Sequence, residues 1–176
     1  MSKRSSLVIL PEEMSQERFD KITYYGAKYV KTPGCESNVK EIYDKTHELE
    51  REPDTVIVNQ FADFANYRFH YYVTGSALLE LFEELSRKGL GTRFSAFTSA
   101  MGSAGTIAAA ERVKEKHPEC RVVGLEPVQC PTLYSNGFGG HDIQGIGDKH
   151  VTWIHNTDAL DAMICIDEWD SKKGMQ

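Results

Sequence analysis

The 176-residue chain lacks the features that mark membrane, secreted and nucleic-acid-binding proteins. It contains no apolar run near the roughly 18 residues that a membrane-spanning helix needs. The apolar run at residues 7–10 is too short for a signal-peptide core. The formal net charge of −6 argues against the basic face with which proteins bind nucleic acid. We therefore expect a cytoplasmic protein with no membrane and no nucleic acid among its partners.

Cysteine and histidine are too irregularly spaced to indicate a disulfide framework or a metal centre. The four cysteines are Cys35, Cys120, Cys130 and Cys165. They form no CxxC pair, and disulfide frameworks belong mainly to small secreted chains, so we expect reduced thiols. The histidines of the C-terminal part are His141, His150 and His155. Their spacing matches no recognised zinc motif, and the sequence therefore predicts no metal site.

The chain does contain an alternation of short apolar strands and amphipathic helices. Expected strands cover residues 7–10, 28–32, 55–60, 94–99, 121–125 and 162–167. Expected helices cover residues 15–26, 38–49 (after a cap at Ser37 or Asn38), 76–88 and 106–116, with another beginning near the C-terminal end. Such alternation is typical of βαβ units. We predict an α/β fold with a mainly parallel sheet and helices on both faces.

A run of small residues stands where the strand at 94–99 gives way to the helix at 106–116. These residues are Gly102, Ser103, Ala104, Gly105 and Thr106. Small residues before a helix let an anion approach unpaired backbone amides, and hydroxyl groups add further donors. Tight turns also require glycine for steric reasons alone. The turn by itself therefore leaves an anion site and a plain tight turn both open.

Three well-known glycine motifs do not fit this turn. A Walker loop ends in Gly-Lys-Ser/Thr, whereas Gly105 is followed by Thr106 and Ile107. A dinucleotide fingerprint needs G-x-G-x-x-G, and only Gly102 and Gly105 are present. A hydrolase elbow needs G-x-S-x-G, whereas Ser103 directly follows glycine. Any anion bound here would have to be held in another way.

Five stretches of the chain follow one another in a recognisable order. They are LPEEMSQERFDKITYYGAKYV, QFADFANYRFHYYVTG, SAMGSAGT, GLEPVQCP and HDIQGIGDK. Together they resemble the fold-type II pyridoxal phosphate enzymes, in particular the branch of cysteine synthase and cystathionine β-synthase. SAMGSAGT is similar to the family's phosphate-cradling GTGGT turn and departs from it at Ser103 and Ala104. The resemblance runs from about Leu7 to Glu168, nearly the whole chain.

The resemblance implies roles for particular residues. The residues that would hold the phosphate of pyridoxal 5'-phosphate are Gly102, Ser103, Ala104, Gly105 and Thr106. Gly145, Ile146 and Gly147 would line the substrate side of the cofactor, and Gln60 with Phe61 would contact the substrate, with Gln60 near its carboxylate. Taken without the family, Gln60 fits a strand-end cap and the two glycines fit an ordinary loop. His70 reads as a structural histidine in either case.

The resemblance also implies an organisation for the chain. The fold would be tryptophan synthase β-like and incomplete at both ends, with residues 1–53 in the smaller N-terminal domain and residues 54–176 in the larger cofactor-binding domain. The family's Schiff-base lysine lies in a motif like S-x-K-D-R. The nearest letters here are Ser2-Lys3-Arg4, without a helix pattern around them. We therefore expect no catalytic lysine in this chain.

Two functions follow from these observations. The first is a segment of a pyridoxal phosphate-dependent enzyme that performs β-replacement or β-elimination on a small-molecule amino acid such as serine or O-acetylserine. The second is a non-catalytic remnant or cofactor-binding module that depends on a partner chain. Both predict a homo-oligomer or a complementing chain, because missing strands would leave sheet edges unpaired. The letters DKHVTWIHN after Gly147 differ from the GAGFIP-like letters of the best-studied cysteine synthases and leave the substrate open.

Overall fold

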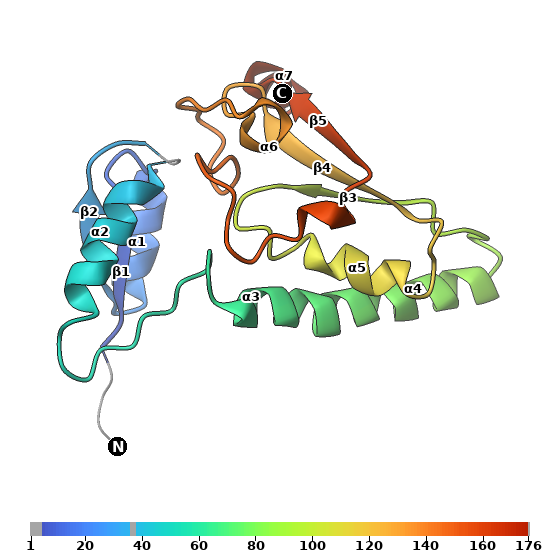
Figure 1. Ribbon diagram of the computed structural model, residues 1–176, viewed down its shortest axis with the longest axis horizontal. Helices are drawn as coiled ribbons and strands as arrows, with labels where there is room; N and C mark the ends of the chain where they lie inside the picture. The colour runs from blue at the N-terminus through green and yellow to red at the C-terminus, as the bar shows by residue number, and fades with distance from the viewer. Residues whose placement is uncertain (1–4, 36–37, 176) are drawn as a thin grey trace.

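The computed structural model describes residues 5–35 and 38–175 and contains two parallel sheets (Figure 1). In the first sheet β1 (Leu7–Pro11) pairs with β2 (Lys28–Thr32). Helix α1 (Gln16–Tyr24) connects these strands, and α2 (Val39–Leu49) follows them. The apolar side chains of Leu10, Met14 and Phe19 form the core of this part.

The second sheet has the order β3-β4-β5 and is parallel throughout. Its strands are β3 (Ala96–Ala100), β4 (Arg121–Pro127) and β5 (Ala162–Ile166). The helices attached to it are α5 (Ala108–Lys114), α6 (Thr132–Ser135), the 3₁₀ turn η2 (Thr157–Ala159) and α7 (Glu168–Gly174). These pairings confirm the predicted α/β class with parallel strands and crossover helices.

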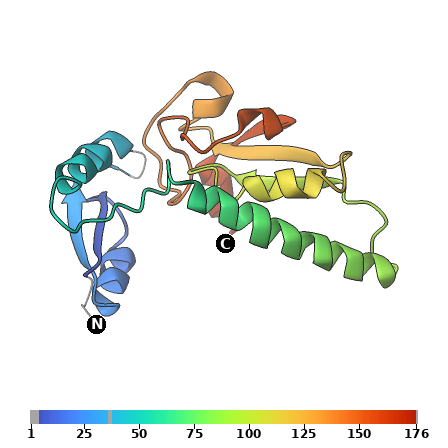
Figure 2. The same ribbon diagram turned by 60° about the horizontal axis from the view of Figure 1, so that its bottom comes forward.

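One long helical run lies along the second sheet's helical layer (Figures 1 and 2). It consists of α3 (Phe64–Phe69), the π-helical turn η1 (His70–Thr74) and α4 (Gly75–Arg87). The run packs against α5, and a Cβ on Gly75 would lie 2.6 Å from the Cβ of Arg112. Only glycine therefore permits this close approach of the two helices.

Helix α5 occupies the centre of the larger core because its side chains are small. Ala108, Ala109, Ala110 and Val113 are fully buried. On one side Ala110 joins Met101 and Val122 in a cluster under the sheet, and on the other Val113 contacts Leu79 of α4. Small side chains let the helix fit between the sheet and α4 without a void, which fixes where the turn before α5 stands.

Most predicted elements are present with ends shifted by one or two residues, but the strand expected at residues 55–60 is wrong. That segment has no regular secondary structure, and the side chains of Val56 and Val58 are 78% and 84% exposed. β-branched residues favour a strand only where cross-strand neighbours pack against them, and none does so in the described part of the chain. Ser37, one of the two expected caps of α2, lies outside the described residues.

The aromatic segment that begins at Phe64 is helical although its sequence shows no clean helical period. The π turn at residues 70–74 inserts extra residues per turn, which shifts the apolar positions before and after it out of register. Helix α5 begins at Ala108 and not at Thr106, because residues 102–107 belong to the turn.

The division into domains at residues 53 and 54 stays a prediction. None of the helices in the described residues combines the length and apolar character needed to cross a bilayer.

The packing of α4 on α5 predicts unequal effects for two leucines on one helix. Leu79 is 9% exposed and lies in the cluster with Val113, whereas Leu81 is 54% exposed. Leu79→Ala should lower the free energy of unfolding by about 2–3 kcal/mol through lost burial and a cavity, and Leu81→Ala by less than about 0.5 kcal/mol. Urea denaturation followed by circular dichroism measures both. Equal effects would contradict the packing described.

A carboxylate immediately before β5 predicts a pH-dependent contribution to stability. Asp161 accepts hydrogen bonds from Lys114 (2.6 Å) and from the amide of Val122 (2.7 Å). The hydrogen bond from Lys114 and that from Val122 lower the pKa of Asp161 to about 2. A lowered folded-state pKa means that this stabilisation is complete above the unfolded-state pKa near 3.8 and is lost as the pH falls toward 2.

Asp161→Asn should therefore lower the melting temperature at pH 7, and the difference from the parent should shrink between pH 4 and pH 2, the window set by the pKa values of Asp161. Asp170→Asn removes the same charge from an exposed carboxylate whose nearest ammonium, on Lys173, is 3.7 Å away. This control should change the melting temperature little at either pH. A difference for Asp161→Asn that stays constant down to pH 2 would contradict the prediction.

Candidate functional site

The turn between β3 and α5 has the shape of an anion-binding concavity. Ala104 adopts a left-handed conformation with φ of 66°, which alanine reaches only at a cost of roughly 1–2 kcal/mol. Alternation of right- and left-handed residues turns successive backbone amides toward one point. Strained residues of this kind persist where the surrounding structure holds them, often at binding sites. Ala104 is itself buried against the core under the sheet.

The amides of this turn are available to a ligand. Those of Ala104, Thr106 and Ile107 have no hydrogen-bond acceptor within residues 5–35 and 38–175, and the amide of Gly105 has only a long contact of 3.4 Å to the hydroxyl of Ser103. Ala104 and Ile107 are buried residues, and buried amides in proteins are nearly always paired. A phosphate group would supply the missing acceptors, so the residues present fit the phosphate of pyridoxal phosphate.

Asn66 of α3 joins the turn to the segment that carries Gln60. Its Nδ2 donates to the hydroxyl of Ser103 (3.0 Å) and to the backbone carbonyl of Gln60 (2.9 Å). A Cβ on Gly105 would overlap the Asn66 side chain, so this position of the turn needs glycine. The hydroxyl of Thr152 donates to the carbonyl of Ser103 (2.8 Å) and holds the turn from the other side.

The loop of Gly145, Ile146 and Gly147 lies directly against the same turn. The amide of Gly147 donates to the carbonyl of Met101 (2.8 Å), and a Cβ on Gly102 would lie 3.1 Å from the carbonyl oxygen of Gly145. Gly145 and Gly147 both have positive φ, 94° and 75°, which glycine adopts without strain. The structure therefore brings together two segments that lie about forty residues apart in the sequence.

A buried histidine supports this loop from beneath. The Nε2 of His141 donates to the carbonyl of Gly147 (3.0 Å). Burial raises the pKa of the neighbouring Cys130 thiol, but hydrogen bonds from His141 and Gly139 outweigh burial, and the pKa of Cys130 lies below its ordinary value. No sequence pattern connects Cys130 with His141. Among the described residues no group of three or more His, Cys, Asp and Glu side chains is arranged to hold a metal ion.

Gln60 and Phe61 occupy different surroundings. Gln60 is exposed at the start of the segment that leads into α3. Phe61 is buried, and its ring packs against Tyr43 (6.0 Å between centroids) and His150 (5.6 Å). His70 makes a hydrogen bond to Thr74 within the π turn (3.0 Å). The substrate roles of Gln60 and Phe61 stay predictions.

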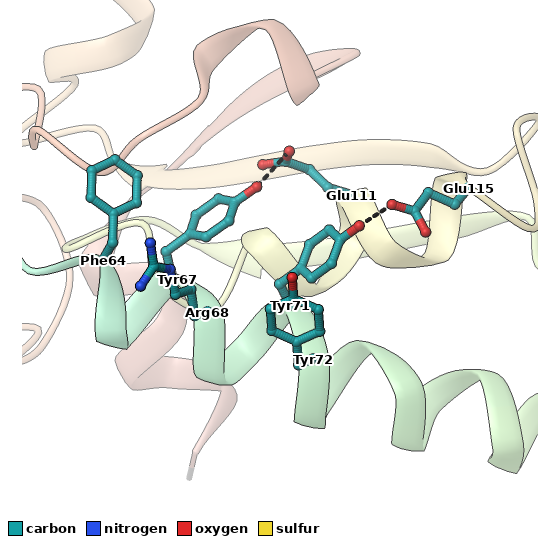
Figure 3. Close-up of a pocket in the computed structure, with 7 residues that line it drawn as sticks. All are labelled: Phe64, Tyr67, Arg68, Tyr71, Tyr72, Glu111 and Glu115. Carbon is teal, nitrogen blue, oxygen red and sulfur yellow. Dashed lines mark hydrogen bonds between the residues drawn. The ribbon is translucent and has the colours of Figure 1, made fainter.

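A separate cleft of about 460 Å³ lies on the outer side of α3 and α5 (Figure 3). Its lining residues are Phe64, Tyr67, Arg68, Tyr71, Tyr72, Glu111 and Glu115. The hydroxyl of Tyr67 donates to Glu111 (2.8 Å), and that of Tyr71 donates to Glu115. Burial and the nearby Glu111 carboxylate raise the pKa of Tyr67 far above its ordinary value. These bonds fasten α3, which carries Asn66, to α5, which follows the turn.

The sequence identified the turn and the loop but missed residues that hold them. Thr152 and His141 support the turn and the loop through single hydrogen bonds to carbonyls, and a contact of that kind leaves no motif. Asn66 belongs to the QFADFANYRFHYYVTG stretch, but no pattern in the letters indicates its bond to Ser103. Lys3, in the only letters similar to a Schiff-base motif, lies outside the described residues.

Comparisons with known proteins identify the family of this chain. The family described as "Pyridoxal-phosphate dependent enzyme" matches residues 3–176. A cysteine synthase from Staphylococcus aureus is 35% identical over 156 residues, which are 88% of this chain and 48% of that protein. Cysteine synthase B from Campylobacter jejuni is 32% identical over 167 residues, 94% of this chain and 53% of that protein. The chain spans about half the length of the curated relatives it matches.

Solved structures show the same fold. A hydrogen sulfide-producing enzyme from Fusobacterium nucleatum superposes with a TM-score of 0.82 at 27% identity, covering 94% of this chain and 49% of that one. O-ureido-L-serine synthase gives a TM-score of 0.84 at 25% identity, covering 96% of this chain and 51% of that one. The fold is tryptophan synthase β-like. Because the family matches nearly the whole sequence and the fold agrees, this chain belongs to the family of pyridoxal-phosphate dependent enzymes.

Proposed function

We propose that this chain supplies the phosphate-binding part of a pyridoxal phosphate enzyme that performs β-replacement or β-elimination on an amino acid such as serine or O-acetylserine. The observation that carries the proposal is the double hydrogen bond of Asn66, which joins the Gln60 segment to Ser103 of the turn. The relatives named cysteine synthase support it. So does an O-acetylserine dependent cystathionine beta-synthase from Helicobacter pylori, with a TM-score of 0.79 at 26% identity.

Each segment has a distinct task in this proposal. The amides of Ala104, Thr106 and Ile107 and the hydroxyls of Ser103 and Thr106 bind the cofactor phosphate. The loop at residues 145–147 covers the cofactor on its substrate side and excludes water there. Gln60 orients the substrate by donating from its side-chain amide to the carboxylate. When bound, pyridoxal phosphate withdraws electrons from the substrate bond that breaks.

The anchoring lysine is proposed to come from another chain or segment. No lysine of this sequence stands in the family's motif for the anchor. The chain alone, even as a homo-oligomer, is therefore proposed to bind the cofactor reversibly and to show no turnover. A complementing chain in the cytoplasm that carries the lysine would complete the enzyme. Residues 1–53 would contribute to its smaller domain and residues 54–176 to its larger one.

Titration of the purified chain with pyridoxal phosphate, followed by borohydride and intact mass measurement, tests this proposal. We expect a saturable change in the cofactor absorbance, competition by inorganic phosphate, and no mass increase after borohydride. Pyridoxal without its phosphate is the control and should not saturate. One reduced adduct per chain would show that a lysine of this chain serves as the anchor. No saturable binding would overturn the assignment of residues 102–106 as the phosphate site.

Two substitutions in the turn separately test the space that Asn66 needs at Gly105 and the left-handed backbone at Ala104. Gly105→Ala places a Cβ on Asn66 and disrupts its bond to Ser103, so the dissociation constant for pyridoxal phosphate should rise at least about tenfold, the effect of one lost charge-assisted hydrogen bond. Ala104→Gly relieves the left-handed alanine and should leave the constant within about twofold. Fluorescence titration measures both. Equal losses in the two variants would show that the turn does not bind the phosphate as proposed.

A further inference from the structure

A cleft of about 500 Å³ adjoins the candidate site on the side of α2. Its lining residues are Asn38, Val39, Lys40, Glu41, Tyr43, Lys149 and His150. One wall comes from the start of α2 and the other from the two residues that follow Asp148 at the end of the glycine loop. The cleft therefore lies between α2 and the residues that follow the glycine loop.

The wall next to the glycine loop is held firmly in place. The hydroxyl of Thr132 donates to the carbonyl of Asp148 (2.7 Å), and the amide of Gly147 donates to Met101 (2.8 Å). The hydroxyl of Tyr43 lies 3.4 Å from Nε2 of His150, whose ring also packs on Phe61. The cleft thus lies beside Phe61, which packs on His150, and beside the glycine loop, whose hydrogen bonds hold the residues before Lys149.

Lys149 supplies a cation to this cleft that no carboxylate neutralises within the described residues. Its ammonium donates to Oδ1 of Asn38 (2.6 Å) and approaches Sγ of Cys35 (3.9 Å). Lys40 also lines the cleft, but its ammonium forms an ion pair with Asp44 (2.5 Å) on the exposed side of α2. Glu41 adds one negative charge to the lining.

The remaining groups of the cleft are uncharged at neutral pH. Burial lowers the pKa of His150 below its ordinary value, so the imidazole is neutral at pH 7. Tyr43 adds its aromatic ring to the lining, and its hydroxyl lies against Nε2 of His150. An apolar wall beside a single unneutralised ammonium suits a short hydrocarbon chain that ends in an anion.

We infer that Lys149 recognises a second, distal carboxylate on the amino-acid substrate or its co-substrate, while the intervening methylene groups pack on Tyr43. The inference rests on the proposed function, because it places the reacting end of that molecule beside residues 145–147. It makes Lys149 a specificity-determining residue, and it assigns the cleft to substrates with a dicarboxylic skeleton. The hydrogen bond to Asn38 holds the Lys149 ammonium in place. The distal carboxylate of the substrate would accept a second hydrogen bond from the same ammonium.

L-Glutamate and L-glutamine test this assignment, because they differ only in the distal group. Binding is followed by NMR through the side-chain amide of Asn38 and the ring signals of Tyr43, with and without pyridoxal phosphate. The parent chain should bind glutamate about tenfold more tightly than glutamine, as expected for one charge-assisted contact. In Lys149→Met the preference should fall to within about twofold. Lys149→Arg should restore most of it.

Lys40→Met is the matched control, since it removes the same charge from the same cleft but from a side chain paired with Asp44. It should keep the preference for glutamate within about twofold of the parent. Equal losses for Lys40→Met and Lys149→Met would overturn the inference, and so would a parent that binds both amino acids equally or shows no shift at Asn38. Because glutamate binding is read without the cofactor, a chain that binds glutamate but not pyridoxal phosphate would refute the proposed function alone.

Discussion

The two hydrogen bonds of the Asn66 side-chain amide set the arrangement on which the candidate site depends. They tie the carbonyl of Gln60 and the hydroxyl of Ser103 to one helix. That helix cannot move relative to the turn, because Tyr67, one residue further, donates to Glu111 of α5. The turn is thus held by α5, which follows it in the chain, and by α3, which contacts it through Asn66. An amide is suited to this task, since it donates two hydrogen bonds without bringing a charge that would repel or neutralise a bound phosphate.

Close helix packing makes this arrangement possible. The run of alanines in α5 and Gly75 at the start of α4 bring the two helices within reach of one another. Larger side chains would push α4, and α3 with it, away from the sheet, and the Asn66 amide would then no longer reach Ser103. The same closeness explains Gly105, whose missing side chain leaves the space that Asn66 occupies. The small residues in this region therefore serve a single geometric purpose from Gly75 to the turn.

The sequence predicted the parts of the molecule that rest on local pattern or on a family motif. The apolar strands, the alanine-rich helix and the glycine turn are of this kind, and the relatives confirm the family and the cofactor class. Prediction from the sequence failed where tertiary contacts determine the local structure. The segment at residues 55–60 has strand propensity but no cross-strand partner in the described chain, and the π turn hides the helical period of the aromatic segment. Thr152 and His141 escape prediction because a bond to a distant carbonyl has no sequence signature.

The positions that depart from the family pattern fall into two groups with different physical consequences. Ser103 and Ala104 replace turn residues with side chains of similar size, and the turn keeps its left-handed residue and its unpaired amides. The residues after Gly147 change in charge and size, and they line the cleft beside α2. Under the proposed function, the turn would hold the cofactor in the same place, and the altered residues beside α2 would change which substrate fits. Lys149 is the residue through which such a change would act, because among the described lining residues its ammonium has no carboxylate partner, whereas that of Lys40 pairs with Asp44.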